Sequence, residues 1–151
     1  MPFEVYLKKG FVKLQRVNFK QIEKQIVRAI KDLDTARIVL DKDSEWAATI
    51  AYQAMLRAGR ALLFSKGYLP ADGGQHRTVV ELTHKLLGKD YSVLIGKFER
   101  MRRRRNIFFY ESDPFGTMTE AESALKTAAQ LVSAIEAMIH KENPQLRLGF
   151  D

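Results

Sequence analysis

The sequence contains no cysteine, which excludes disulfide bonds and thiolate chemistry and favours a reducing compartment. No apolar run approaches the ~20 residues that a helix needs to cross a bilayer. Lysines interrupt the apolar residues at the N-terminus, where a signal peptide would need a continuous core. We therefore expect the 151-residue chain to be cytoplasmic and to have no membrane partner.

Several signatures of enzymes and metal sites are missing as well. Gly73 and Gly74 form a bare pair without the Gly-Lys-Ser/Thr ending of a phosphate-binding loop, and no Gly-x-Ser-x-Gly nucleophile elbow is present. The three histidines, His76, His84 and His140, occur without cysteines and do not have metal-site spacing. We therefore expect neither a metal nor an organic cofactor.

The histidines are weak candidates for a catalytic base. His76 and His84 are eight residues apart, which rotates one from the other by ~80° around a helix, so both do not face one point. His76 is near a predicted helix start and can approach a cleft, although a capped or solvent-facing side chain is favoured. His140 is near the end of the last predicted helix, where the helix dipole favours a cation.

The net charge of +7 indicates an anionic partner such as RNA or an acidic protein, although surplus lysine on solvated faces would give the same balance. The length fits one domain with a sizeable core.

Apolar residues recur at three- and four-residue intervals through most of the chain, which is the period of a helix buried on one face. Residues 19–42 show it most clearly, and residues 44–66 are apolar around most of their girth, as in a central helix with close neighbours. Further helices are predicted for 75–87, 91–111 and 119–141. In residues 44–66 the polar strip is narrow and consists of Thr49, Gln53, Arg57 and Arg60.

Capping residues mark several of these boundaries. Ser44 is a candidate N-cap for one helix, and Thr119 with Glu122 matches a capping box at the start of the last helix. The Asn143-Pro144 pair marks the end of that helix.

The patterns together predict an all-α, up-and-down bundle of four to five main helices. We expect the bundle to span residues 19–142 and to be followed by a tail at 143–151. Residues 1–18 form an extension whose structure the sequence leaves open. It is either a short helix or a hairpin of Phe3–Leu7 against Phe11–Gln15.

The most unusual stretch is the arginine-rich part of the helix predicted for 91–111, where five of the six residues from Arg100 to Arg105 are arginine. Arg105 shares the spacing of the apolar stripe, so it should lie against the edge of the core, keep its charge and need a partner. Asn106 and Tyr110 are four residues apart and lie on a neighbouring strip. Arg105, Asn106 and Tyr110 are therefore our candidate site.

The other arginines of the run have two readings, a solvated face or a patch that follows the phosphates of RNA. This set consists of Arg100, Arg102, Arg103 and Arg104. The aromatic residues are expected to form core or dimer contacts rather than base-stacking platforms. They are Phe98, Phe108 and Phe109, with Trp46 and Tyr52 expected in the core.

One segment resembles a known family. The run Ala51-Tyr-Gln-Ala-Met-Leu-Arg-Ala-Gly-Arg-Ala-Leu-Leu63, followed by Gly67 and Pro70, is similar to the second helix of HEPN domains. The similarity is closest to the small stand-alone bacterial and archaeal group that is also labelled UPF0332.

Other motifs resemble this family in the same order, over about residues 3 to 140. Leu7-Lys-Lys-Gly10 and Ala29-Ile-Lys-Asp-Leu-Asp-Thr-Ala36 resemble the N-terminal segments of the group, and His76-Arg-Thr-Val79 resembles the start of its third helix. Arg105-Asn-Ile-Phe-Phe-Tyr110 falls where HEPN domains carry an arginine, a polar residue, three variable residues and a histidine.

The resemblance implies a bundle that dimerises by setting the arginine helices of two copies against each other. In active members the arginine and histidine of both subunits line a cleft and cleave RNA without metal. Stand-alone members often occur as toxin partners of a minimal nucleotidyltransferase. On this pattern Arg105 matches the arginine, Asn106 the polar neighbour, and Tyr110 occupies the histidine position.

The tyrosine matters for the chemistry, because a phenol with a pKa near 10 is ionised only about one part in a thousand at pH 7. Nearby arginines would lower that pKa. We therefore expect an RNA-directed, toxin-type protein that is a metal-independent ribonuclease or a degenerate form of one, paired with a minimal nucleotidyltransferase. The alternatives are a non-catalytic module that binds nucleotide, RNA or the partner enzyme, and a structural dimer.

Overall fold

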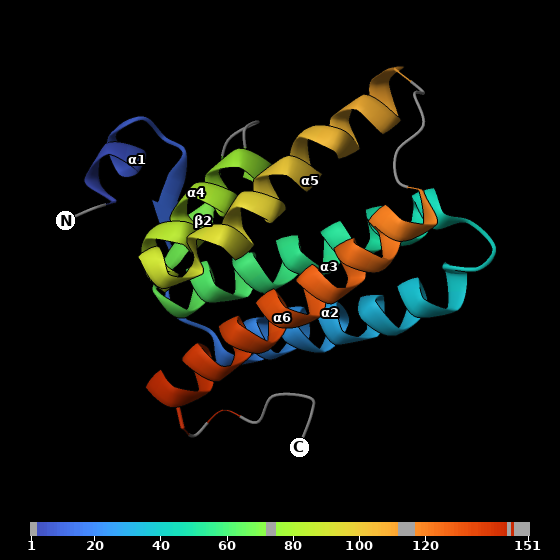
Figure 1. Cartoon of the computed structure of the whole chain (residues 1–151). Coiled ribbons are helices and arrows are strands. Elements are labelled where there is room, and N and C mark those ends of the chain that lie inside the picture. Colours follow the sequence, from blue (N-terminus) through green and yellow to red (C-terminus); the bar gives the residue numbers. More distant parts are fainter. Residues whose placement is uncertain (1–2, 72–74, 112–116, 145, 147–151) are drawn as a thin grey trace.

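Five long helices form a bundle in the computed structural model, which describes residues 3–71, 75–111, 117–144 and 146. The side chains of residues 75 and 106–111 lie outside the described set. The helices are α2 (Phe19–Val39), α3 (Ser44–Ser65), α4 (Gln75–Leu87), α5 (Ser92–Glu111) and α6 (Met118–Glu142). Their packing confirms the predicted all-α bundle (Figure 1).

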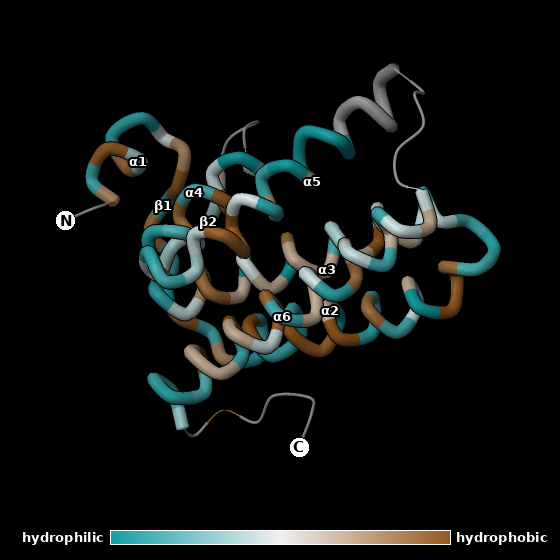
Figure 2. The backbone as a smooth tube through the Cα atoms, viewed as in Figure 1, coloured by the Kyte–Doolittle hydropathy of each residue, from teal (hydrophilic) through white to brown (hydrophobic). Residues whose placement is uncertain are grey.

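The central helix of the bundle is α3. It packs against α2 and α6 on one side and against α4 and α5 on the other (Figure 1). Its ridge of small side chains is completely buried and consists of Ala47, Ala51, Ala54, Ala58 and Ala61. Small side chains let neighbouring helices approach closely. The run of arginines makes the middle of α5 hydrophilic, in contrast to the apolar inner turns of the bundle (Figure 2).

The closest approach is between α3 and α4, at Gly59. A Cβ atom added there would lie 2.6 Å from Val79 Cγ1 and 2.9 Å from Thr83 Oγ1, so no side chain fits. Tyr52 precedes Gly59 by seven residues and His76 precedes Val79 by three, which places each pair on one helix face. The contact at Gly59 therefore also brings Tyr52 toward His76.

The N-terminal segment contains the short helix α1 (Glu4–Lys8) and the strand β1 (Val12–Leu14). The strand pairs antiparallel with β2 (Tyr68–Pro70), which follows α3. Of the two predicted alternatives, the short helix is observed and the hairpin is wrong. The pairing joins segments that are far apart in the sequence, and three-residue strands are too short to show an alternating pattern, so local reasoning missed the sheet.

Two predicted N-caps are displaced in the structure. The N-cap of α3 is Asp43 rather than Ser44, and its Oδ1 accepts a hydrogen bond from the backbone N–H three residues later at 3.0 Å. The capping box of α6 uses Thr117 with Glu120 rather than Thr119 with Glu122, so the cap lies two residues earlier than predicted. The Thr-x-x-Glu spacing occurs twice in this stretch, and local spacing alone does not distinguish the two.

Two of the aromatic residues predicted for the core, Tyr52 and Phe98, are fully buried. The prediction for Trp46 is wrong, because this side chain is 45% exposed in the first turn of α3, where fewer neighbours surround the helix. Phe108 and Phe109 lie outside the described side chains.

A buried carboxylate links α2 to α3. The Asp32 side chain is only 6% exposed, and its two oxygens accept from Arg57 Nε at 2.9 Å and Arg28 Nε at 3.0 Å. Removing one member of a buried ion pair leaves the other charge without compensation.

We expect Gly59→Ala to lower the free energy of unfolding. Overpacking against Val79 and Thr83 should cost ~1–3 kcal/mol, and the better helix propensity of alanine recovers only about 1 kcal/mol of this. Gly96→Ala in α5 is the matched control, since a Cβ there meets nothing within 4 Å and should stabilise the protein slightly. Denaturant unfolding compares the two, and equal stabilisation by both would contradict the close contact.

We expect Asp32→Ala to destabilise the protein by about 2 kcal/mol, because Arg57 loses its buried partner. Asp34→Ala is the control, since Asp34 is 66% exposed in its ion pair with Arg37 and should change stability by less than ~0.5 kcal/mol. Thermal unfolding of both variants measures the difference. Equal effects would show that the pair between α2 and α3 is not important for stability.

Candidate functional site

The cations of α5 are divided between two faces of the helix. Arg102 and Arg105 act electrostatically on Tyr52 of α3 and His76 of α4. The outer cations line a groove beside α6 and are Lys97, Arg100, Arg103 and Arg104. The arginine run therefore contributes to two separate surfaces. One is an inner cluster beside Tyr52 and His76, and the other is an outer groove beside α6.

A tyrosine–histidine pair lies at the centre of the inner cluster. Tyr52 Oη and His76 Nδ1 are 2.9 Å apart, and the two rings stack with centroids 5.8 Å apart and an interplanar angle of 27°. Tyr52 is completely buried, whereas His76 is partly exposed at the start of α4. A buried hydroxyl needs a hydrogen-bond partner, and His76 supplies it.

The surroundings keep both members of this pair neutral. Burial, followed by the charges of Arg105, Arg60 and Arg102, lowers the pKa of His76 to about 4. Burial raises the pKa of the Tyr52 hydroxyl well above its ordinary value. At neutral pH the phenol therefore carries its proton and the imidazole is uncharged.

These protonation states indicate which way the hydrogen bond points. Tyr52 donates its proton to Nδ1 of His76, so the ring proton of His76 is on Nε2. We assign this tautomer from the hydrogen-bond pattern. His76 then presents an N–H donor on the side of its ring away from Tyr52.

The arginines of the inner cluster differ in whether a carboxylate balances their charge. Arg102 Nη2 donates to Glu99 Oε2 at 3.3 Å, and Arg102 Nε donates to the same carboxylate. Arg60 is partly buried, and within the described residues it has no carboxylate partner. Burial and then the charge of Arg57 lower the pKa of Arg60, but a guanidinium remains charged at neutral pH.

The outer groove, about 540 Å³ in volume, lies between α3, α5 and α6. Its apolar part includes Ala48, Met101 and Ala124. One ion pair crosses it, from Arg104 Nη2 to Glu120 Oε2 at 3.0 Å. Three of the four arginines predicted to bind nucleic acid line this groove, and Arg102 belongs to the inner cluster instead.

The predicted site is only partly within the described structure. Arg105 is partly buried and lies within electrostatic range of His76 and Tyr52. The side chains of Asn106 and Tyr110 lie outside the described set, so their place beside Arg105 stays a prediction.

Sequence reasoning missed the inner cluster as a site. His76 was expected to be capped or to face solvent, and the structure corrects this because it is partly buried and bonded to Tyr52. Arg60 was assigned to a polar strip and Tyr52 only to the core. A signal was present in Gly59, which lies on the same helix face as Tyr52 and predicts a close neighbour for that face.

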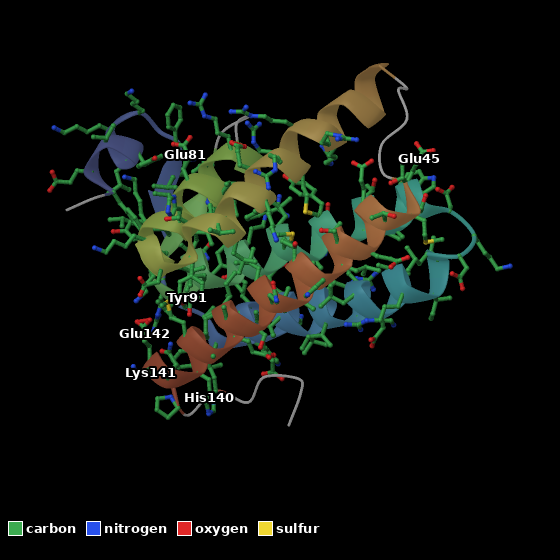
Figure 3. All side chains as sticks on the ribbon, in the orientation of Figure 1. Glu45, Glu81, Tyr91, His140, Lys141 and Glu142 are labelled. Carbon is green, nitrogen blue, oxygen red and sulfur yellow. The ribbon has the colours of Figure 1, made fainter. Side chains whose placement is uncertain are left out.

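The other two histidines lie apart from this cluster. His84 Nε2 lies 3.1 Å from Ser92 Oγ, which links α4 to α5. His140 is exposed at the C-terminal end of α6, beside Lys141 and Glu142 (Figure 3). Both positions are consistent with structural roles.

The fold and the inner cluster together define a helical-bundle protein in which α3, α4 and α5 contribute to one basic cluster. Comparison with protein-family models matches residues 22–138 to the HEPN domain. The match covers most of the chain, which therefore belongs to the HEPN domain family. Comparison with curated proteins and with solved structures gives no match.

The part of the chain that the structure describes has neither a membrane-spanning helix nor a cluster of metal ligands. None of the described helices is long and apolar enough to cross a membrane. None of the described histidine and acidic side chains forms a group of three or more arranged to hold a metal ion.

We expect Arg105→Gln to raise the pKa of His76 from about 4, because it removes the strongest charge that opposes protonation. The pKa should stay below 6.5, since burial and two arginines remain. A pH titration of the histidine rings by ¹H–¹⁵N NMR measures it. Arg104→Gln, on the other face of α5, should leave the pKa unchanged, and equal shifts in both variants would contradict the division of the helix.

Proposed function

We propose that this protein is a cytoplasmic, RNA-directed HEPN protein of the stand-alone, UPF0332-like group. In this proposal it forms a homodimer and is the toxin-type partner of a minimal nucleotidyltransferase. It acts as a metal-independent ribonuclease or as a degenerate form of one. The observation that supports this best is the partly buried Arg105, which lies where the sequence resembles the HEPN motif and which acts on His76 together with Arg60 and Arg102.

The proposed chemistry needs groups that stabilise negative charge on phosphate and a group that takes the 2′-hydroxyl proton. Arg105 supplies a guanidinium for the phosphate, and a second copy would supply another in a dimer that sets two α5 helices against each other. Asn106 would hydrogen bond the RNA. Tyr110 would position the RNA, or would act as the base if the arginines lower its pKa strongly.

In this proposal the outer groove supplies further cations that bind the RNA. Lys97, Arg100 and Arg103 lie along one surface of the groove, where their charges can follow a phosphate backbone. The ion pair between Arg104 and Glu120 occupies one part of it.

A second candidate function is a non-catalytic module that binds RNA, a nucleotide or the partner enzyme through the same cations. The observation that favours it is the lack of a well-matched base. His76, with a pKa of about 4, is a weak proton acceptor at neutral pH, and tyrosine replaces histidine at position 110. In a third reading, a structural dimer, Arg105 would pair with a carboxylate across the interface.

We expect the purified protein to cleave mixed RNA in the presence of a chelator. Arg105→Ala should reduce the rate by about 10²-fold or more, which is typical when a donor to a developing anion is removed. Tyr110→Phe should also lose cleavage if the phenol takes part in the proton transfer. Arg37→Ala is the matched control, since this exposed arginine on α2 is paired with Asp34 and should not alter the rate.

The outcomes separate the candidate functions. Binding without cleavage, weakened by Arg105→Ala but not by Arg37→Ala, would favour the non-catalytic module. Unchanged RNA binding together with a weakened dimer in Arg105→Ala would favour the structural reading and would contradict the proposed function.

A further inference from the structure

We propose that the outer groove is a docking site for an acidic amphipathic helix of a partner protein. The apolar side chains of such a helix would lie on the floor of the groove, and its carboxylates would face Lys97, Arg100 and Arg103. A docked helix would also cover cations that the proposed function assigns to RNA, so the two ligands would exclude each other. Only this exclusion rests on the proposed function.

The dimensions of the groove suit a helix. Its lining residues extend from Lys97 to Arg104 along α5 and from Thr119 to Thr127 along α6. At a rise of about 1.5 Å per residue, these stretches are about 10 and 12 Å long, which corresponds to about two turns of helix. The volume of about 540 Å³ is typical of sites that enclose apolar groups. A helix whose apolar residues recur at three- and four-residue intervals can fill a groove of this length.

The floor of the groove is apolar and comes from three helices. Ala48 of α3, Met101 of α5 and Ala124 of α6 belong to it, and all three are buried. The two alanines are small, so a neighbouring helix can approach closely. Met101 is unbranched and polarisable, so its side chain adapts to the shape of a partner. The floor is therefore suited to aliphatic side chains.

The charge of the groove is concentrated on the α5 wall. Within the described part of the chain, Lys97, Arg100 and Arg103 form no ion pair with a carboxylate. Among the described lining residues, α6 contributes hydroxyl side chains, an alanine and Glu120, which pairs with Arg104. A partner whose carboxylates lie along the α5 wall therefore has the complementary charge.

The floor favours a helix over RNA as the ligand of this groove. Single-stranded RNA is held by cations together with aromatic side chains on which its bases stack. None of the described side chains that line the groove is aromatic. Phosphates would contact the α5 wall and leave the apolar floor unused, whereas an amphipathic helix would contact both.

The test uses a designed peptide of about 15 residues, which is long enough to form a helix in water. Leucines at i, i+3, i+4 and i+7 form one face, and glutamates lie on both sides of this face. One control peptide has glutamine in place of every glutamate. A second control has the same residues in an order that distributes the leucines around the helix. Fluorescence anisotropy of the labelled peptides measures their binding to the full chain.

We expect the acidic amphipathic peptide to bind with a Kd of about 100 µM or lower, and each control peptide to bind at least about tenfold more weakly. The first control lacks the charge and the second lacks the apolar face. A Kd above this value for the acidic amphipathic peptide would overturn the proposal, and so would equal affinity of the three peptides.

Ser123→Trp tests the floor of the groove without changing a charge. Ser123 is exposed on the α6 wall, so an indole there would occupy the groove and should lower the affinity for the peptide at least about tenfold. Ser133→Trp is the matched control, because Ser133 is exposed on α6 outside the lining of the groove and should leave the affinity unchanged. Equal affinity of the two variants would overturn the proposal.

The double variant Arg100→Glu with Arg103→Glu tests the cationic wall. Like charges would then face each other, so the affinity for the peptide should fall at least about tenfold. Lys24→Glu with Lys126→Glu changes the net charge equally at exposed positions outside this groove and should have little effect. Circular dichroism and thermal unfolding confirm that each variant is folded. Unchanged affinity in the folded Arg100/Arg103 variant would contradict the proposed docking.

An RNA probe separates docking from the proposed function. A labelled 2′-O-methyl uridine oligonucleotide of about 12 residues carries phosphates but no free 2′-hydroxyl, so it reports binding without cleavage. We expect the unlabelled peptide to displace it. Peptide binding without oligonucleotide binding would support docking and remove the groove from the proposed function. Oligonucleotide binding without peptide binding would overturn docking and leave the proposed function intact.

Discussion

The packing of α3 against α4 at Gly59 is the constraint on which the inner cluster depends. A Cβ atom there would collide with Val79 and Thr83, so the two helices lie closer than ordinary side chains allow. The same faces carry Tyr52 and His76, which therefore come within hydrogen-bonding distance. Each satisfies a polar atom of the other, and this makes a polar pair tolerable beside an apolar interface. The absence of a Cβ atom at Gly59 therefore influences the hydrogen bonding of the inner cluster as well as its packing.

The arginines of the bundle differ in whether a carboxylate pairs with them. Asp32 compensates Arg57 between α2 and α3, and Glu99 compensates Arg102 within α5. Arg60 has no such partner among the described residues, and His76 stays neutral rather than adding another charge. An uncompensated, partly buried cation weakens the fold but is already in place for an anion.

The helices could be predicted from the sequence because each carries its own periodic signal, as the alanine ridge of α3 and the stripe of α2 do. The features that were missed are non-local or locally ambiguous. β1 pairs with a strand more than fifty residues away, and two overlapping Thr-x-x-Glu motifs compete for the start of α6. In the site, Arg105 is partly buried where its phase in the helix places it. The role of His76 arises from a neighbouring helix, which no pattern within α4 reveals.

The positions of the cations around the α5 helix limit which insertions and deletions the sequence tolerates. Consecutive residues are separated by about 100° around a helix, and the inner and outer cations alternate within a few positions. Replacing one arginine alters one surface. Inserting or deleting a single residue early in α5 would rotate every later side chain by that angle, moving Arg102 and Arg105 away from His76 and disrupting the groove at the same time. The spacing along this helix is therefore less free to vary than the residues that occupy it.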